Sequence, residues 1–169
     1  MLQLEDKEAT REALTNAMDS YSWIHLACHG FQHPAQPLES GFALADGRLE
    51  LATIIKSNLK HAEFAFLSAC ETSTGDADLS EESVHLAAAM LVTGYRGVVG
   101  TMWSIADQYA PQVAEDFYRE LFARSPEIDG SKMLDGEQAA YALHHAVQQL
   151  RKRVGSAIHL WVPYVHFGL

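Results

Sequence analysis

Short apolar runs alternate with longer amphipathic stretches along this chain, and the alternation limits the folds it can adopt. The runs with the length and flanking turn residues of a buried strand are 23–28, 64–69, 97–102 and 161–167. The stretches with the apolar spacing of a core-packed helix are 3–18, 51–59, 80–94, 111–123 and 137–153. This order predicts an α/β fold with a mostly parallel sheet and helices on both faces.

The length and composition fit a single domain. The chain has 169 residues, of which 48% are hydrophobic, and this is enough to build one sizeable core. Neither a repeat nor a linker interrupts the pattern, so we expect one domain over 1–169, with a leading helix over 3 to about 18. Between the first two strands, prolines and glycines predict a long loop with a hairpin around 42–49.

The charge and the hydropathy pattern exclude several classes of partner. A net charge of −10 disfavours binding to nucleic acid, because a broad basic surface is needed to neutralise phosphates. Every apolar run is shorter than the roughly 18 residues that cross a bilayer, and the first residues lack the features of a signal peptide. We therefore expect an intracellular, cytoplasmic protein without a membrane or nucleic-acid partner, with two cysteines that remain free thiols.

The two residues whose side chains are best suited to catalysis lie at the ends of the first two predicted strands. His29 follows the first strand and Cys70 the second. Because the carboxyl ends of parallel strands meet at one edge of a sheet, residues 41 apart in sequence (70 − 29) can approach each other there. A nucleophilic cysteine needs a neighbour that favours the thiolate, and an imidazole can provide it. Without further context, a buried cysteine and a turn histidine remain an alternative explanation.

The residues around this pair resemble a known family. The segments 23–30 (WIHLACHG) and 66–72 (FLSACET) resemble the two catalytic motifs of CHAT-domain proteins, which are relatives of caspases and separases. The segments 40–47, 97–107 and 161–168 are similar to the hairpin, the next strand with its loop, and the final strand of that family. The resemblance runs from about Trp23 to Gly168 and implies a caspase-like three-layer sandwich.

The resemblance also implies a function. His29 matches the catalytic histidine of the family, Cys70 its nucleophile, and Gly30 a backbone position that helps to hold the oxyanion. The expected activity is that of a regulated cysteine endopeptidase that hydrolyses protein or peptide substrates and needs no cofactor. The alternative is a catalytically silent CHAT-like module for protein interaction or assembly.

Two departures from the family pattern bear on that choice. Ser73 stands where many members have the glycine of Cys-Glu-Thr-Gly, which affects the path of the loop after Cys70. The chain is also shorter than the complete two-part domain, so we expect that an amino-terminal half or a regulatory domain can act as its partner.

Asp107 is a candidate for substrate binding. It aligns with an acidic position that, in separase-like relatives, can receive a basic residue before the scissile bond. The alternative is that Asp107 accepts hydrogen bonds from amide groups at the start of the helix near Pro111.

The other histidines and cysteine have simpler explanations. By the period of two in a strand, Cys28 faces away from His29 and is predicted to pack in the core. His25 is predicted to be a packed, hydrogen-bonded histidine. A metal site is not predicted, because residues four apart on an extended chain, such as His25, His29 and His33, lie about 13 Å from each other.

Overall fold

The computed structural model describes residues 1–169 apart from 32, 34, 58, 69, 72–82 and 104, and only the backbone of 70, 71, 83–85 and 128. Its α-helices are α1 (Arg11–Ser20), α2 (Leu51–Lys56), α3 (Ser83–Val92), α4 (Ala110–Arg124), α5 (Ala139–Val154) and α6 (Ile158–Trp161). Its strands are β1 (Trp23–Leu26), β2 (His29–Phe31), β3 (Gly41–Leu44), β4 (Gly47–Glu50), β5 (Phe64–Leu67), β6 (Cys70–Glu71), β7 (Gly97–Thr101), β8 (Glu127–Ile128), β9 (Ser131–Lys132) and β10 (Tyr164–Gly168).

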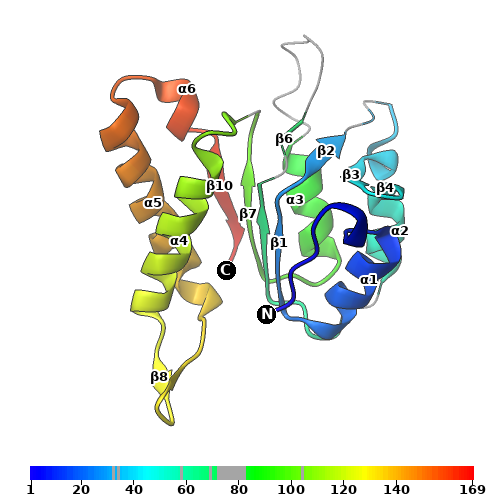
Figure 1. The fold of residues 1–169 in the computed structure, drawn as a ribbon, viewed down its shortest axis with the longest axis horizontal. Coiled ribbons are helices and arrows are strands. Elements are labelled where there is room, and N and C mark those ends of the chain that lie inside the picture. The colour runs from blue at the N-terminus through cyan, green and yellow to red at the C-terminus, as the bar shows by residue number, and fades with distance from the viewer. Residues whose placement is uncertain (32, 34, 58, 69, 72–82, 104) are drawn as a thin grey trace.

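A central sheet separates two layers of helices. Its strand order is β1-β5-β7-β10, in which β1, β5 and β7 are parallel and β10 is antiparallel to β7. Figure 1 shows α4 and α5 on one side of this sheet and α1, α2 and α3 on the other. The predicted α/β sandwich, with a mostly parallel sheet and helices on both faces, is therefore confirmed.

A second, smaller sheet extends the first at the carboxyl ends of β1 and β5. Its strand order is β4-β3-β2-β6, and β3 and β4 form the hairpin that was predicted around 42–49. Strands β2 and β6 follow β1 and β5 in the chain and run parallel to each other. The chain after the first strand is thus not simply a loop, because His29 begins a strand of the second sheet.

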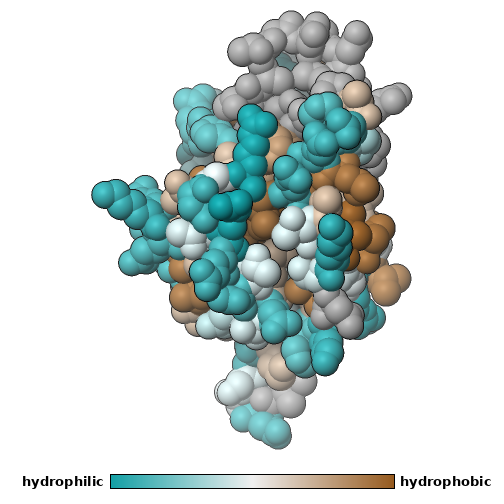
Figure 2. All heavy atoms as spheres, turned by 90° about the vertical axis from the view of Figure 1, so that its right-hand side faces the viewer, coloured by the Kyte–Doolittle hydropathy of each residue, from teal (hydrophilic) through white to brown (hydrophobic). Residues whose placement is uncertain are grey.

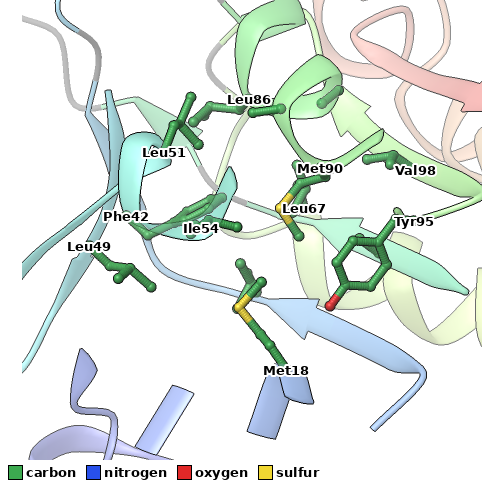
Figure 3. Packing of buried hydrophobic residues seen from close by; sticks show 14 of the residues in the cluster. Met18, Phe42, Leu49, Leu51, Ile54, Leu67, Leu86, Met90, Tyr95 and Val98 are labelled. Carbon is green, nitrogen blue, oxygen red and sulfur yellow. The ribbon is translucent and has the colours of Figure 1, made fainter. Parts of the chain in front are cut away.

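The alternation of side chains along β5 builds two hydrophobic cores. Ala65 and Leu67 join the core under α1, α2 and α3, whereas Phe64 and Phe66 join the core under α4 and α5. In β7, Val98 and Val99 divide in the same way. Figure 3 shows the first core, in which side chains from helices and from both sheets pack together. Both faces of the sheet are therefore covered, as the apolar runs require.

Three helical segments differ from their predicted bounds or orientation. Asp6 has a positive φ of 47°, which interrupts the leading helix, and Thr10 caps a helix that spans Arg11–Ser20 rather than 3–18. The helix predicted over 80–94 ends at Val92, which is 70% exposed because α3 is apolar over most of its length and its pattern does not define one face. The end of the chain was predicted as a strand from Trp161, but that residue closes α6. Ser80, at the start of the helix predicted over 80–94, lies outside the described residues.

The outer surface over α1 and α2 is mixed in character. Figure 2 shows hydrophilic side chains over much of this side of the molecule, with apolar groups between them. In the described parts of the chain, none of the helices combines the length and apolar character needed to cross a membrane.

Candidate active site

The register of the strands brings His29 and Cys70 opposite each other. In the central sheet, Leu26 of β1 is the partner of Leu67 of β5, and in the second sheet His29 of β2 is the partner of Cys70 of β6. Both pairs have the same sequence separation of 41 residues (67 − 26 and 70 − 29). The register of β1 and β5 is thus kept when these two segments of the chain continue into β2 and β6 of the second sheet.

Hydrogen bonds stabilise the crossing between the two sheets. The backbone N–H of Ser68 donates to the carbonyl of Leu26 at 2.9 Å, which extends the pairing of β1 and β5 by one step. The side chain of Ser68 also lies 3.2 Å from the imidazole of His25, measured from Oγ to Nε2. These contacts fix the chain just before Cys70.

The two faces of the second sheet differ sharply. Gly30 pairs with Phe42 of β3 and with Glu71 of β6, and Phe42 and Leu49 in that row are 0% and 3% exposed. The neighbouring row contains His29, and its side chain is exposed. Because alternate residues of a strand face opposite sides, the row of His29 lies on the outer face, away from the core.

The environment of Cys28 makes it a poor nucleophile. Cys28 lies in the link between β1 and β2, where it is a free cysteine packed against the core under α1, α2 and α3. Burial penalises the thiolate and raises the pKa of the Cys28 thiol to about 11. The prediction that Cys28 packs in the core is confirmed, and its thiol stays protonated at neutral pH.

His25 is held by aromatic rings as well as by Ser68. Its imidazole centroid lies 4.8 Å from that of Phe66 and 5.6 Å from that of Tyr118 in α4. Although part of the residue is open to solvent, the surrounding protein atoms lower the pKa of His25 by desolvation. The predicted packed, hydrogen-bonded histidine is confirmed.

Asp107 lies between β7 and α4, after the carboxyl end of β7. Because β7 is parallel to β5, this segment leaves the sheet at the same edge as Ser68. Asp107 is exposed, and α4 begins after Tyr109 as its N-cap. Among the described hydrogen bonds, none joins the Asp107 carboxylate to the first turn of α4, so the alternative role as a helix cap is not supported.

A comparison with protein families gives a match to the CHAT domain over residues 3–169. The chain belongs to the CHAT-domain family. CHAT domains are associated with caspase-like cysteine peptidases. A comparison with curated proteins found no match.

The structure adds one residue to the candidate site that the sequence patterns did not single out. Ser68 lies two residues before Cys70 in the second motif and contacts His25, whose register partner Phe66 lies two residues before Ser68. His25 lies in the first predicted strand and Ser68 in the second, and this placement on neighbouring strands could have indicated the contact. Ser73, the departure from the family motif, lies outside the described residues.

Proposed function

We propose that this CHAT domain is a cysteine endopeptidase in which His29 and Cys70 form the catalytic dyad. The observation that carries the proposal is the register of β2 and β6, in which these residues are direct partners. Neighbouring strands lie about 4.8 Å apart, and register partners lie on one face of a sheet. Membership of the CHAT-domain family supports the same assignment.

The reaction follows from the chemistry of the two groups. The Cys70 thiolate attacks the scissile carbonyl, and backbone N–H groups near Gly30 and Cys70 stabilise the oxyanion. His29 protonates the leaving amine as the peptide C–N bond breaks, which leaves a thioester on Cys70. Water then attacks the thioester with His29 as base, releases the new carboxyl end and restores the thiol. Asp107 is the proposed contact for a basic residue before the scissile bond.

The exposure of His29 is compatible with this role. A general acid must reach the substrate as well as the nucleophile, and His29 lies on the open face of the second sheet. Cys28 is a much weaker candidate, because its raised pKa keeps it protonated. The chemistry is therefore assigned to Cys70.

Labelling with a peptidyl acyloxymethyl ketone tests the dyad. This electrophile reacts with an activated thiolate, so Cys70→Ala should abolish labelling and His29→Ala should slow it by about 10²-fold or more. Cys28→Ala and His61→Ala are matched controls that should label at the rate of the unmodified chain.

A peptide-library cleavage assay on the same variants measures turnover. Cleavage by the unmodified chain that is lost in both dyad variants would support the endopeptidase. Equal labelling in the Cys70→Ala chain, or no labelling and no cleavage by the unmodified chain, would contradict it and favour a silent interaction module.

A further inference from the structure

Arg48 lies on the same face of the second sheet as the proposed dyad. In the register of this sheet, Cys70, His29, Ala43 and Arg48 form one row across β6, β2, β3 and β4. The adjacent row faces the core, where Leu49 is only 3% exposed. Arg48 is exposed, so it shares the open face on which a substrate would meet His29.

The guanidinium of Arg48 is held in place by an aromatic ring. Its Cζ atom lies 4.4 Å from the ring centroid of Phe31, two residues after His29 in β2. Stacking on a ring orients a guanidinium but leaves the N–H groups at its edge free to donate. Phe31 thus positions the charge of Arg48 beside the row of the dyad.

Arg48 differs from the other arginine near this hairpin. Arg11 is engaged by Asp46, with Nε and Oδ2 3.3 Å apart. Among the described residues, no carboxylate oxygen lies within 4.0 Å of the Arg48 nitrogens, although Glu50 shares its strand and face. In a chain with a net charge of −10, a cation without a carboxylate partner beside the site is available for an anionic group.

We propose that Arg48 and Phe31 form a subsite that binds the carboxylate of a glutamate or aspartate side chain in the peptide substrate. The inference rests on the proposed peptidase function, because it assigns a substrate preference to the same face. Phe31 lies two residues after His29 in β2, or about 7 Å along the strand, so the guanidinium stacked on its ring lies within reach of a peptide bound at His29.

The chemistry of the subsite favours a carboxylate. A single guanidinium matches the two oxygens of one carboxylate with parallel N–H donors. The contact is exposed, so its contribution is modest and falls with ionic strength. We expect a preference of about three- to ten-fold for an acidic residue over its amide.

A binding experiment without catalysis tests this subsite. Immobilised protein that carries Cys70→Ala is equilibrated with a random library of eight-residue peptides, and the bound peptides are quantified by mass spectrometry. Glutamate and aspartate should be enriched about three-fold or more over glutamine and asparagine, and 0.5 M NaCl should reduce this enrichment.

Variants of Arg48 in the same background decide the assignment. Arg48→Gln should remove the enrichment, and Arg48→Glu should shift it towards lysine. Arg96→Gln removes an exposed arginine at the other end of β7, and Glu50→Gln alters a neighbour on the same face, so both should keep the acidic preference. Circular dichroism spectra matching the parent would show that the variants are folded.

The outcomes separate the subsite from the peptidase function. Acidic enrichment that depends on Arg48 supports the subsite even if the unmodified chain cleaves no peptide. Absence of acidic enrichment, or enrichment that survives Arg48→Gln, overturns the subsite even if cleavage is observed.

Discussion

At the scale of single residues, the structure separates the two cysteines by their place in the fold. Cys28 is packed against the core, whereas Cys70 begins a strand of the second sheet beside His29. Desolvation disfavours a thiolate, and a protonated thiol is a poor nucleophile. Cys28, in the link between β1 and β2, is thus expected to react much more slowly than an accessible thiol.

Alkylation of Cys28 can be predicted from its raised pKa. In a Cys70→Ala chain at pH 7.5, Cys28 should react with iodoacetamide at least about 100-fold more slowly than glutathione, because its pKa of about 11 leaves little thiolate. The rate should rise with pH until about pH 11. Mass spectrometry of the alkylated chain measures both effects.

The urea-unfolded chain is the control for this experiment, because unfolding returns Cys28 to water. Its alkylation should then approach the rate of glutathione. A fast reaction of the folded chain at pH 7.5 would show that Cys28 is not buried from reagent.

At the scale of elements, the β3–β4 hairpin depends on a close approach at Gly41. A Cβ atom at this position would lie 2.0 Å from the carbonyl oxygen of Leu49 and 2.9 Å from the Cα of Glu50. Both atoms belong to the backbone of β4, so they cannot move aside as a side chain could. Gly41 is therefore required where the two strands meet.

Gly41→Ala should reduce the free energy of unfolding by more than about 2 kcal/mol, because the clash separates the hairpin strands. Urea denaturation followed by circular dichroism measures the change. Gly100→Ala is the matched control, since a Cβ there would meet other atoms at 3.8 Å or more. A loss for Gly41→Ala no larger than for Gly100→Ala would refute the requirement.

The element patterns predicted the central sheet well but not the second sheet. Phe64 to Leu67 is apolar at every position, and such a run is recognised as a buried strand. By contrast, β2 has three residues and β6 has two, which is too short for any period to be visible. Their strand conformation comes from pairing with each other and with β3, which is a tertiary effect.

The candidate site was predicted only in part for a similar reason. His29 and Cys70 follow the apolar strands directly, so their meeting at one edge could be predicted from topology. The row that joins His29 to Arg48 depends on the pairing of β2 with β3. The sequence predicted a long loop after the first strand, and that prediction had no strand at β2. The stacking of Arg48 on Phe31 could therefore not be predicted.

At the scale of the whole molecule, partly enclosed histidines connect stability to pH. His25 packs between β5 and α4, and His166 of β10 stacks on Phe64 with ring centroids 6.3 Å apart. Desolvation lowers the pKa of both histidines in the folded chain. The unfolded chain then binds protons more readily than the folded chain in mildly acidic solution.

The free energy of unfolding should therefore decrease as the pH falls below about 6.5, the ordinary pKa of an unfolded histidine. Above that pH both states are neutral at these positions, and the stabilising difference is fully present. Urea denaturation between pH 8 and pH 5 measures the decrease.

His25→Phe and His166→Phe keep an aromatic ring and remove the titration, so each should flatten the pH dependence. His61→Gln, at an exposed position, is the control. Unchanged pH dependence in both phenylalanine variants would show that these two histidines do not cause the decrease.

Paired residues of β1 and β5, and of β2 and β6, are all 41 positions apart in the sequence. This shared separation has an evolutionary consequence. Alignment of His29 with Cys70 is set by two short links, each of two residues, that join the sheets after Leu26 and Leu67. A change in the length of the chain between Phe31 and Phe64 should leave His29 opposite Cys70. A single residue inserted in either link would turn His29 or Cys70 to the opposite face of the second sheet. Length variation should therefore be tolerated between Phe31 and Phe64 and selected against in the two links.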